Sequence, residues 1–226
     1  MWYTVNMRRE PLVTGEYYHI YNRGVDKRDV FSDKKDLERF KETIKQFNQT
    51  EGIGSLEMYH KSVRALSSHP KAKPLVAMVA FCINPNHFHF VLKQLVDGGI
   101  AKFMQKVLAG YTYYFNQKNQ RSGALFQGTF KSKLVKNENY FRKIFAYVNQ
   151  NYLVHDIPRD KLSFIFAGDQ EYESGTFDFI SKTEGQTMLK IFGGASNLKK
   201  HCQEIVSIIR EERGKISLKE SEELPQ

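Results

Sequence analysis

Two apolar segments joined by a short polar link constrain the fold most strongly. Residues 75–83 form a continuous apolar run without helical spacing, and residues 87–93 follow directly after Asn84-Pro85-Asn86. A run of this length that ends at turn residues is typical of a buried strand. Because so short a link can join only antiparallel neighbours, the sequence predicts a buried antiparallel hairpin inside a sheet.

The second strand of this hairpin carries two histidines. Side chains alternate across a strand, so His87 and His89 point to one face while Phe88 and Phe90 point to the other. Two neutral imidazoles at this spacing can hold one divalent cation. The simple alternative is a pair of histidines on a half-exposed strand face, and the motif alone does not decide between the two.

The rest of the chain shows alternating strands and helices. Residues 16–24 indicate a strand that ends at a glycine, with Tyr17, His19, Tyr21 and Arg23 on one face, a set better suited to nucleic acid than to a core. Helical spacing predicts helices over residues 33–48, from 98 to about 118, 137–154, 187–191 and 197–213. The other segments are predicted as a strand near 56–59, a flexible basic loop over 61–73, a short strand within 124–135 and a surface connection over 164–184.

Charge and composition narrow the class of partner. The 226 residues include 34 Lys and Arg against 25 Asp and Glu, a formal charge of +9, which favours a polyanion, nucleic acid first. Cys82 lies inside an apolar run and indicates a core residue, not half of a disulfide. No signal peptide is visible and no apolar run reaches about 18 residues, so we expect a cytoplasmic protein without a membrane partner.

The helix predicted over 137–154 contains a second pair of polar residues. Its apolar stripe includes Phe141, Phe145 and Val148, and Tyr147 lies off this stripe. Asn151 is one turn after Tyr147 and is therefore expected on the same face. A tyrosine hydroxyl can act as a nucleophile and an amide oxygen can bind a hard metal. Taken alone, Tyr147 is most simply a half-exposed surface tyrosine.

Four segments in this order carry a family resemblance. They are residues 18–24 (YHIYNRG), 84–90 (NPNHFHF), 123–131 (GALFQGTFK) and 147–151 (YVNQN). Together they resemble the IS200-like (Y1) tyrosine transposases of the HUH endonucleases, including the REP-associated tyrosine transposases, over about residues 15–155. Two positions depart from the family pattern: Asn84 replaces Met, which should be harmless, and Tyr152 replaces Pro, which lets the helix continue.

The resemblance implies a catalytic set. His87 and His89 would be metal ligands, Asn151 the third protein ligand, and Tyr147 the nucleophile. Members of the family use Mg²⁺ or Mn²⁺ to cleave and rejoin single-stranded DNA through a 5′-phosphotyrosine intermediate, often beside an imperfect hairpin. Imidazole is softer than Mg²⁺ prefers, so modest affinity and good function with Mn²⁺ are expected.

The resemblance also implies the fold and the DNA-binding face. We expect an α+β, ferredoxin- or RRM-like, mainly antiparallel sheet with helices on one face, while the other face binds DNA. The residues expected to contact DNA are Tyr17, His19, Tyr21, Arg23, Lys131 and Lys133, although the two lysines are as simply explained as solvated surface residues. Residues 1–157 would form the transposase domain, and 158–226 a partly helical extension with a disordered tail.

Two alternatives remain at this point. The first is a non-catalytic nucleic-acid-binding protein that keeps the fold, although the four catalytic positions are intact. The second is a rolling-circle replication initiator or relaxase, which usually orders its motifs differently and often carries a helicase domain. This sequence has no Walker-type motif. The DNA target and the choice between monomer and homodimer are left open.

Overall fold

A single five-stranded sheet organises the molecule. The computed structural model describes residues 11–65, 72–155 and 157–222. Within these residues the strand order is β4-β1-β3-β2-β5 and all neighbours are antiparallel. The strands are β1 (Tyr17–Arg23), β2 (Val76–Asn84), β3 (His87–Gln94), β4 (Lys131–Leu134) and β5 (Phe166–Ala167). The order of the first four strands, with a helix after β1 and another after β3, is ferredoxin-like, which confirms the predicted α+β class.

The predicted hairpin lies at the centre of this sheet. β2 pairs with β3 so that Ile83 lies opposite Phe88 and Asn84 lies opposite His87. Every residue of β2 is buried, as expected of a strand covered on both faces. The hairpin prediction is therefore confirmed, including the common face of His87 and His89.

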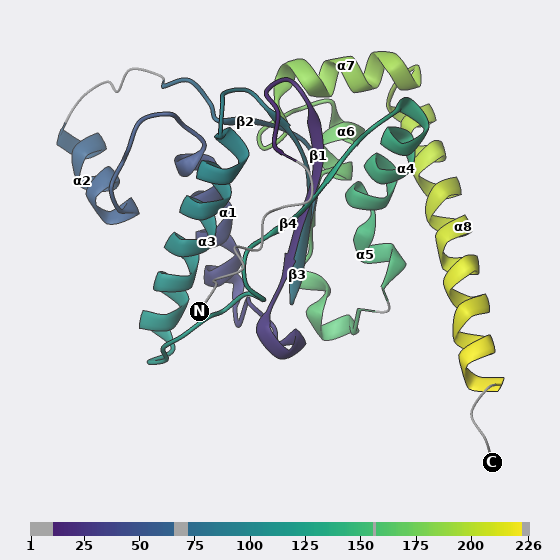
Figure 1. Ribbon diagram of the computed structural model, residues 1–226, viewed down its shortest axis with the longest axis horizontal. Helices are drawn as coiled ribbons and strands as arrows, with labels where there is room; N and C mark the ends of the chain where they lie inside the picture. Colours follow the sequence, from purple (N-terminus) through teal and green to yellow (C-terminus); the bar gives the residue numbers. More distant parts are fainter. Residues whose placement is uncertain (1–10, 66–71, 156, 223–226) are drawn as a thin grey trace, which may run out of the picture.

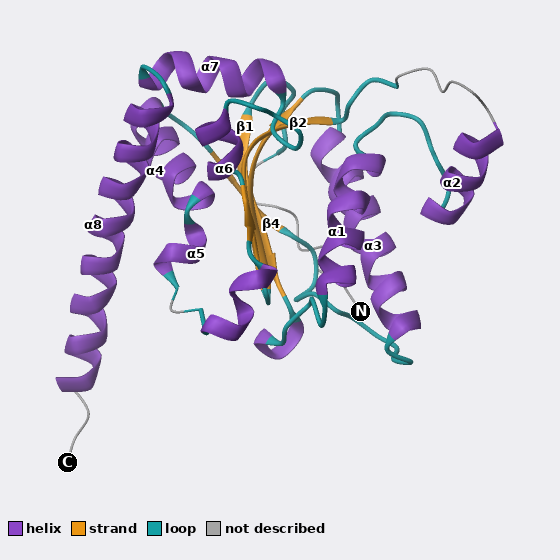
Figure 2. Ribbon diagram, turned by 180° about the vertical axis from the view of Figure 1, so that it is seen from behind, coloured by secondary structure: helices purple, strands orange, loops and turns teal. Residues whose placement is uncertain are grey.

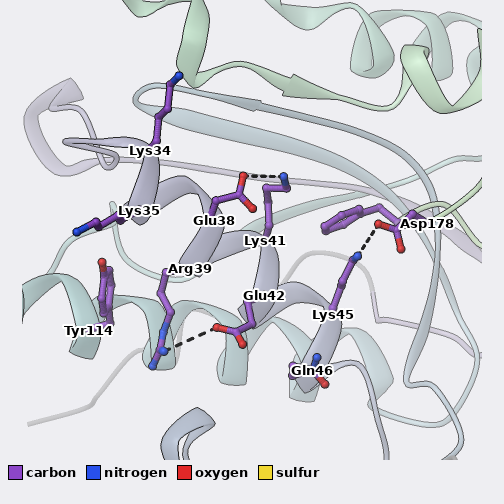
Figure 3. Close-up of a pocket in the computed structure, with 11 residues that line it drawn as sticks. Lys34, Lys35, Glu38, Arg39, Lys41, Glu42, Lys45, Gln46, Tyr114 and Asp178 are labelled. Atoms are coloured by element: carbon purple, nitrogen blue, oxygen red, sulfur yellow. Dashed lines mark hydrogen bonds and ion pairs between the residues drawn. The ribbon is translucent and has the colours of Figure 1, made fainter. Parts of the chain in front are cut away.

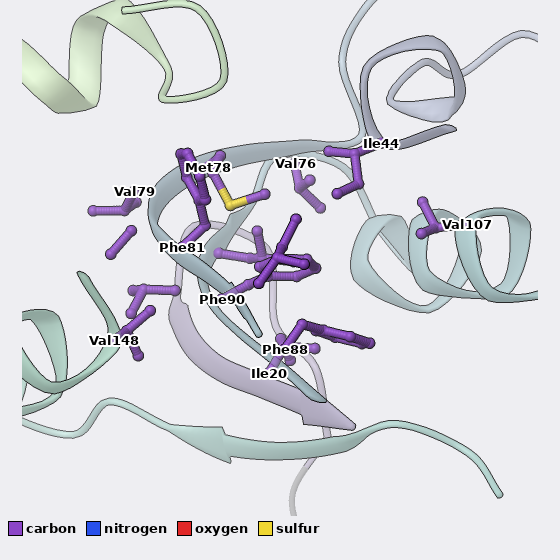
Figure 4. Close-up of a cluster of buried hydrophobic side chains, with 14 of the residues drawn as sticks. Ile20, Ile44, Val76, Met78, Val79, Phe81, Phe88, Phe90, Val107 and Val148 are labelled. Carbon is purple, nitrogen blue, oxygen red and sulfur yellow. The ribbon is translucent and has the colours of Figure 1, made fainter. Parts of the chain in front are cut away.

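Two long helices cover one face of the sheet, α1 (Lys34–Phe47) and α3 (Gly99–Lys118). α1 begins where the Asp33 side chain accepts a hydrogen bond from the Asp36 amide at 3.0 Å. Figure 4 shows Phe88 and Phe90 pointing toward the side where α1 and α3 lie. Both phenylalanines are fully buried, and each such ring contributes about 1.5–3 kcal/mol by leaving water.

Helices also cover the opposite face, which the sequence predicted to be free for DNA. Figures 1 and 2 place α4 (Glu138–Asn149), α5 (Asn151–Val154) and α8 (Ala195–Glu222) on the side of the sheet away from α1 and α3. Phe145 and Val148 of α4 are fully buried there. That detail of the expected fold is wrong because the apolar stripe of α4 requires the second face for its own burial.

The segment after α1 also differs from expectation. The strand expected near residues 56–59 is the start of helix α2 (Leu56–Ala65), whose Leu56 is buried. The predicted loop over 61–73 is helical up to Ala65, and residues 66–71 lie outside the described residues. Two glycines before Leu56 suggested a strand, but a four-residue apolar pattern cannot separate a strand from one side of a short helix.

The C-terminal region is more ordered than the surface connection that the sequence predicted over 164–184. It contains β5, α6 (Asp169–Ser174) and the start of α7 (Lys182–Phe192). Tyr172 is buried and donates a hydrogen bond to the Val79 carbonyl at 2.7 Å. α8 continues through residues 219–222, which were expected in a disordered tail. None of the described helices is both long and apolar enough to cross a membrane.

Candidate active site

The two predicted histidines begin strand β3 and lie side by side. Their ring centroids are 5.3 Å apart, and both side chains are buried. Burial lowers the pKa of His87 to about 4 and holds the pKa of His89 well below its ordinary value. Both imidazoles are therefore neutral at pH 7, the state in which a ring nitrogen can bind a metal.

The loop before β3 determines which nitrogen of His87 carries the proton. Asn86 donates through Nδ2 to the Lys27 carbonyl at 3.0 Å, which turns its Oδ1 toward His87. That oxygen lies 2.6 Å from His87 Nδ1 and can only accept. Nδ1 is therefore the protonated nitrogen, and Nε2 is left with a free lone pair.

Asn151 faces this lone pair. Its Oδ1 lies 3.0 Å from His87 Nε2, so two acceptors point at one another. Asn84 Nδ2 lies 2.9 Å from Asn151 Oδ1 and 3.1 Å from His87 Nε2, and donates toward this pair. Ligand atoms at the bond lengths of Mg²⁺, about 2.0–2.1 Å in octahedral geometry, are themselves about 3 Å apart. The spacing and chemistry of the two acceptors therefore fit a divalent cation.

Asn151 is the third candidate ligand, and together with His87 and His89 it forms a set of two imidazoles and one amide. In the part of the chain that the structure describes, no group of three or more His, Cys, Asp or Glu side chains is arranged to hold a metal. The set of His87, His89 and Asn151 is of a different kind, because its oxygen comes from an amide. Asn84, whose replacement of Met was expected to be harmless, is fully buried and hydrogen-bonded within this set.

A break in the helical segment that contains Tyr147, the candidate nucleophile, separates this residue from Asn151. The sequence predicted a continuous helix over 137–154, but α4 ends at Asn149 and α5 begins at Asn151. Gln150 between them has φ −119° and ψ 28°, outside helical values. As a result Asn151 lies against His87 while Tyr147 lies against His89.

Tyr147 is half-buried next to the histidines. Its ring centroid is 5.4 Å from that of His89 and 6.2 Å from that of His19, with the planes nearly perpendicular. The candidate nucleophile and the candidate ligands therefore share one site, although they come from a strand and a helix far apart in sequence.

His19, which was predicted to contact DNA, lies beside His89. It is buried on β1, and its Nε2 lies 2.8 Å from His89 Nδ1. Burial lowers the pKa of His19 to about 3, so both rings are neutral and one nitrogen of this pair carries the shared proton. If His89 donates from Nδ1, its Nε2 keeps a lone pair for a metal.

A cavity of about 240 Å³ opens beside these residues. It is lined by Tyr21, Asn22, Arg23, His87, His89, Gln127, Lys131, Tyr147, His155 and Arg213; we call it the histidine cavity. Of the predicted DNA contacts, Tyr17, His19 and Lys133 do not line it. The Tyr17 hydroxyl donates to Glu184 at 2.8 Å, and Lys133 Nζ lies 4.9 Å from the centre of the Tyr140 ring.

Comparison with known proteins places the site in a family. Residues 57–151, which include His87, His89, Tyr147 and Asn151, match the family model described as "Transposase IS200 like". Over these residues the chain resembles the IS200-like transposases, which confirms the predicted resemblance and indicates a transposase-like, DNA-cleaving enzyme.

Curated proteins and solved structures provide two further comparisons. No curated protein matches the chain. One similar solved structure is described as "Structure of the REP associates tyrosine transposase bound to a REP hairpin". It is 12% identical, with a TM-score of 0.47, and the similarity covers 78% of this chain and 91% of that one.

Proposed function

We propose that this protein is a metal-dependent single-stranded DNA endonuclease and strand transferase. One observation supports the proposal: Tyr147, His87 and His89 line a cavity whose described lining carries only positive fixed charges. Asn151 is buried behind this lining and contacts His87. The substrate is single-stranded or hairpin DNA, and the protein acts in the cytoplasm.

In the proposed reaction the Tyr147 hydroxyl attacks a backbone phosphorus. A bond forms between the tyrosine oxygen and phosphorus, the phenol gives up its proton, and the 3′ oxygen leaves as a 3′-OH. The DNA is left joined to Tyr147 through its 5′ phosphate, and attack by a 3′-OH reverses the step. Mg²⁺ or Mn²⁺ held by His87, His89 and Asn151 would polarise the phosphate. No ATP is required because the phosphodiester energy is retained in the covalent intermediate.

The neutral histidines and the cationic rim suit a phosphodiester. Arg23 and Lys131 line the cavity together with the ring of Tyr21, and Lys131 Nζ lies 6.0 Å from the centre of that ring. Cations neutralise the backbone, while a tyrosine ring can stack on an unpaired base. A base that is paired in a duplex is not available for such stacking, which favours single-stranded DNA at this point.

End-labelled oligonucleotides test the proposal. A hairpin with single-stranded flanks is incubated with the protein and Mn²⁺ or Mg²⁺, then run on a denaturing gel. A label at the 3′ end should move with the protein, whereas a label at the 5′ end should appear in a shorter free strand. Tyr147→Phe and chelation should both abolish the adduct. Tyr152→Phe is the matched control, because the Tyr152 hydroxyl donates to Asp169 at 2.7 Å.

Two results would contradict the proposal in different ways. An adduct that persists in Tyr147→Phe would assign the nucleophile to another tyrosine. Tight DNA binding without any adduct would instead support the non-catalytic DNA-binding protein with the same fold.

A further inference from the structure

Helix α8 brings a cation from the C-terminal extension to the histidine cavity. Its buried stripe consists of Leu198, Cys202 and Val206, and Ile209 continues it half-buried. The same spacing leads next to Arg213, so this arginine lies on the packing face of α8. Its Nη1 is 3.4 Å from the Val154 carbonyl at the end of α5, and the side chain lines the cavity.

Arg213 joins two cations from other elements. Arg23 comes from β1 and Lys131 from β4, and all three line the histidine cavity. Among the described residues that line it there is no carboxylate. Like charges held close together repel one another unless an anion lies between them.

We propose that Arg213 binds a backbone phosphate of the DNA strand beside the phosphate that Tyr147 attacks, with Arg23 as its partner. The C-terminal extension is then part of the DNA-binding site. A guanidinium group suits this role because its planar set of donors matches two phosphate oxygens at once. This inference rests on the proposed function, since it assigns a further contact to the same substrate.

DNA binding without cleavage tests the proposal. Binding of a fluorescent hairpin oligonucleotide with single-stranded flanks is measured by anisotropy in the Tyr147→Phe protein, with chelator, from about 50 to about 200 mM salt. Arg213→Ala should weaken binding about 5- to 10-fold and reduce the salt slope by about 1. Arg213→Lys should recover part of the affinity. Lys200→Ala, which removes one exposed cation elsewhere on α8, should change affinity less than about 2-fold.

The competing explanation is that Arg213 only stabilises the end of α5 through the Val154 carbonyl. In that case Arg213→Ala would lower the melting temperature but bind DNA with the affinity and salt slope of Lys200→Ala, which would overturn the proposal. Because the assay needs no cleavage, an absent adduct would contradict the proposed reaction and leave this result unaffected. An adduct in the wild type with unchanged DNA binding in Arg213→Ala would contradict this inference alone.

Discussion

Two polar cavities among the described residues differ in size and in charge, and the larger one does not contain the candidate site. A groove of about 840 Å³ runs along the outer surface of α1 (Figure 3), whereas the histidine cavity measures about 240 Å³. The α1 groove is lined by five cations and three carboxylates. The histidine cavity is lined by three fixed cations, and its described lining contains no carboxylate. Charge balance, more than size, distinguishes the two.

The three carboxylates of the α1 groove pair with three of its five cations. Lys41 pairs with Glu38 at 2.8 Å and Lys45 with Asp178 at 2.5 Å (Figure 3). Such exposed pairs contribute about 0–1 kcal/mol each and keep a helix surface solvated. The histidine cavity has neutral imidazoles in place of carboxylates, so an anionic phosphate would balance its cations, while the imidazoles could bind a metal.

Removal of a tyrosine hydroxyl should affect adduct formation much more in the histidine cavity than in the α1 groove. Tyr147→Phe is expected to reduce adduct formation by at least about 10³-fold, because no other group replaces the nucleophile. Tyr114→Phe in the α1 groove loses only a hydrogen bond to Asp36 at 3.1 Å. It should cost about 1 kcal/mol of stability and leave the adduct unchanged. Single-turnover gels and thermal melts measure both effects, and equal loss of adduct in the two variants would break the comparison.

Metal binding should depend on the histidine cavity and not on the α1 groove. We expect His87→Ala to weaken Mn²⁺ binding by about 10- to 100-fold, which titration followed by electron paramagnetic resonance can measure without DNA. The control is His60→Ala, which removes a histidine that lies 2.7 Å from Glu42, a residue of the α1 groove. If both variants bind Mn²⁺ as the wild type does, the metal site is misplaced.

Loss of one lysine should affect DNA affinity in the histidine cavity more than in the α1 groove. Lys131→Ala is expected to weaken binding of a single-stranded oligonucleotide about 3- to 10-fold, because a phosphate contact and its counterion release are lost. Lys45→Ala removes the same charge, but from a pair with Asp178, and should change affinity less than about 2-fold. Anisotropy titrations at fixed salt compare them. A larger effect of Lys45→Ala would move the DNA-binding surface to α1.

The buried histidines should make stability depend on pH. The folded-state pKa values are about 3 for His19 and about 4 for His87, below the ordinary value of 6.5. Above pH 6.5 neither the folded nor the unfolded state binds these protons, so proton binding does not lower the free energy of unfolding there. As the pH falls below 6.5 the unfolded chain takes up protons first, and stability declines until the folded pKa values are passed. Melting temperatures from pH 7 to 4 should therefore fall, and less steeply in His19→Phe; identical slopes would contradict this explanation.

The sequence predicted the part of the site that depends on local periodicity. The hairpin and the shared face of His87 and His89 follow from alternation along a strand, and the Tyr147 position follows from the family motif. Local patterns do not predict which distant side chains meet. Arg213 continues an apolar stripe that looks like ordinary helix packing, so its arrival at the cavity depends on how α8 docks.

Two features of the site depend on contacts between elements. Asn84 was predicted to be a harmless replacement, and its sequence neighbours do not indicate that it donates a hydrogen bond to Asn151, a residue of another element. The break at Gln150 was hidden because the helical stripe continues through it in the sequence. In both cases the local pattern of a strand or helix does not contain the contacts that Asn151 makes with other elements.

Mass spectrometry of the covalent adduct tests the central claim most directly. After nuclease and trypsin digestion, the peptide of residues 144–159 contains both Tyr147 and Tyr152, and residues 137–142 contain Tyr140. We predict a nucleotide remnant, linked through its 5′ phosphate, on Tyr147 of the longer peptide. A remnant on Tyr140, Tyr152 or a tyrosine outside these peptides would contradict the assignment of the nucleophile.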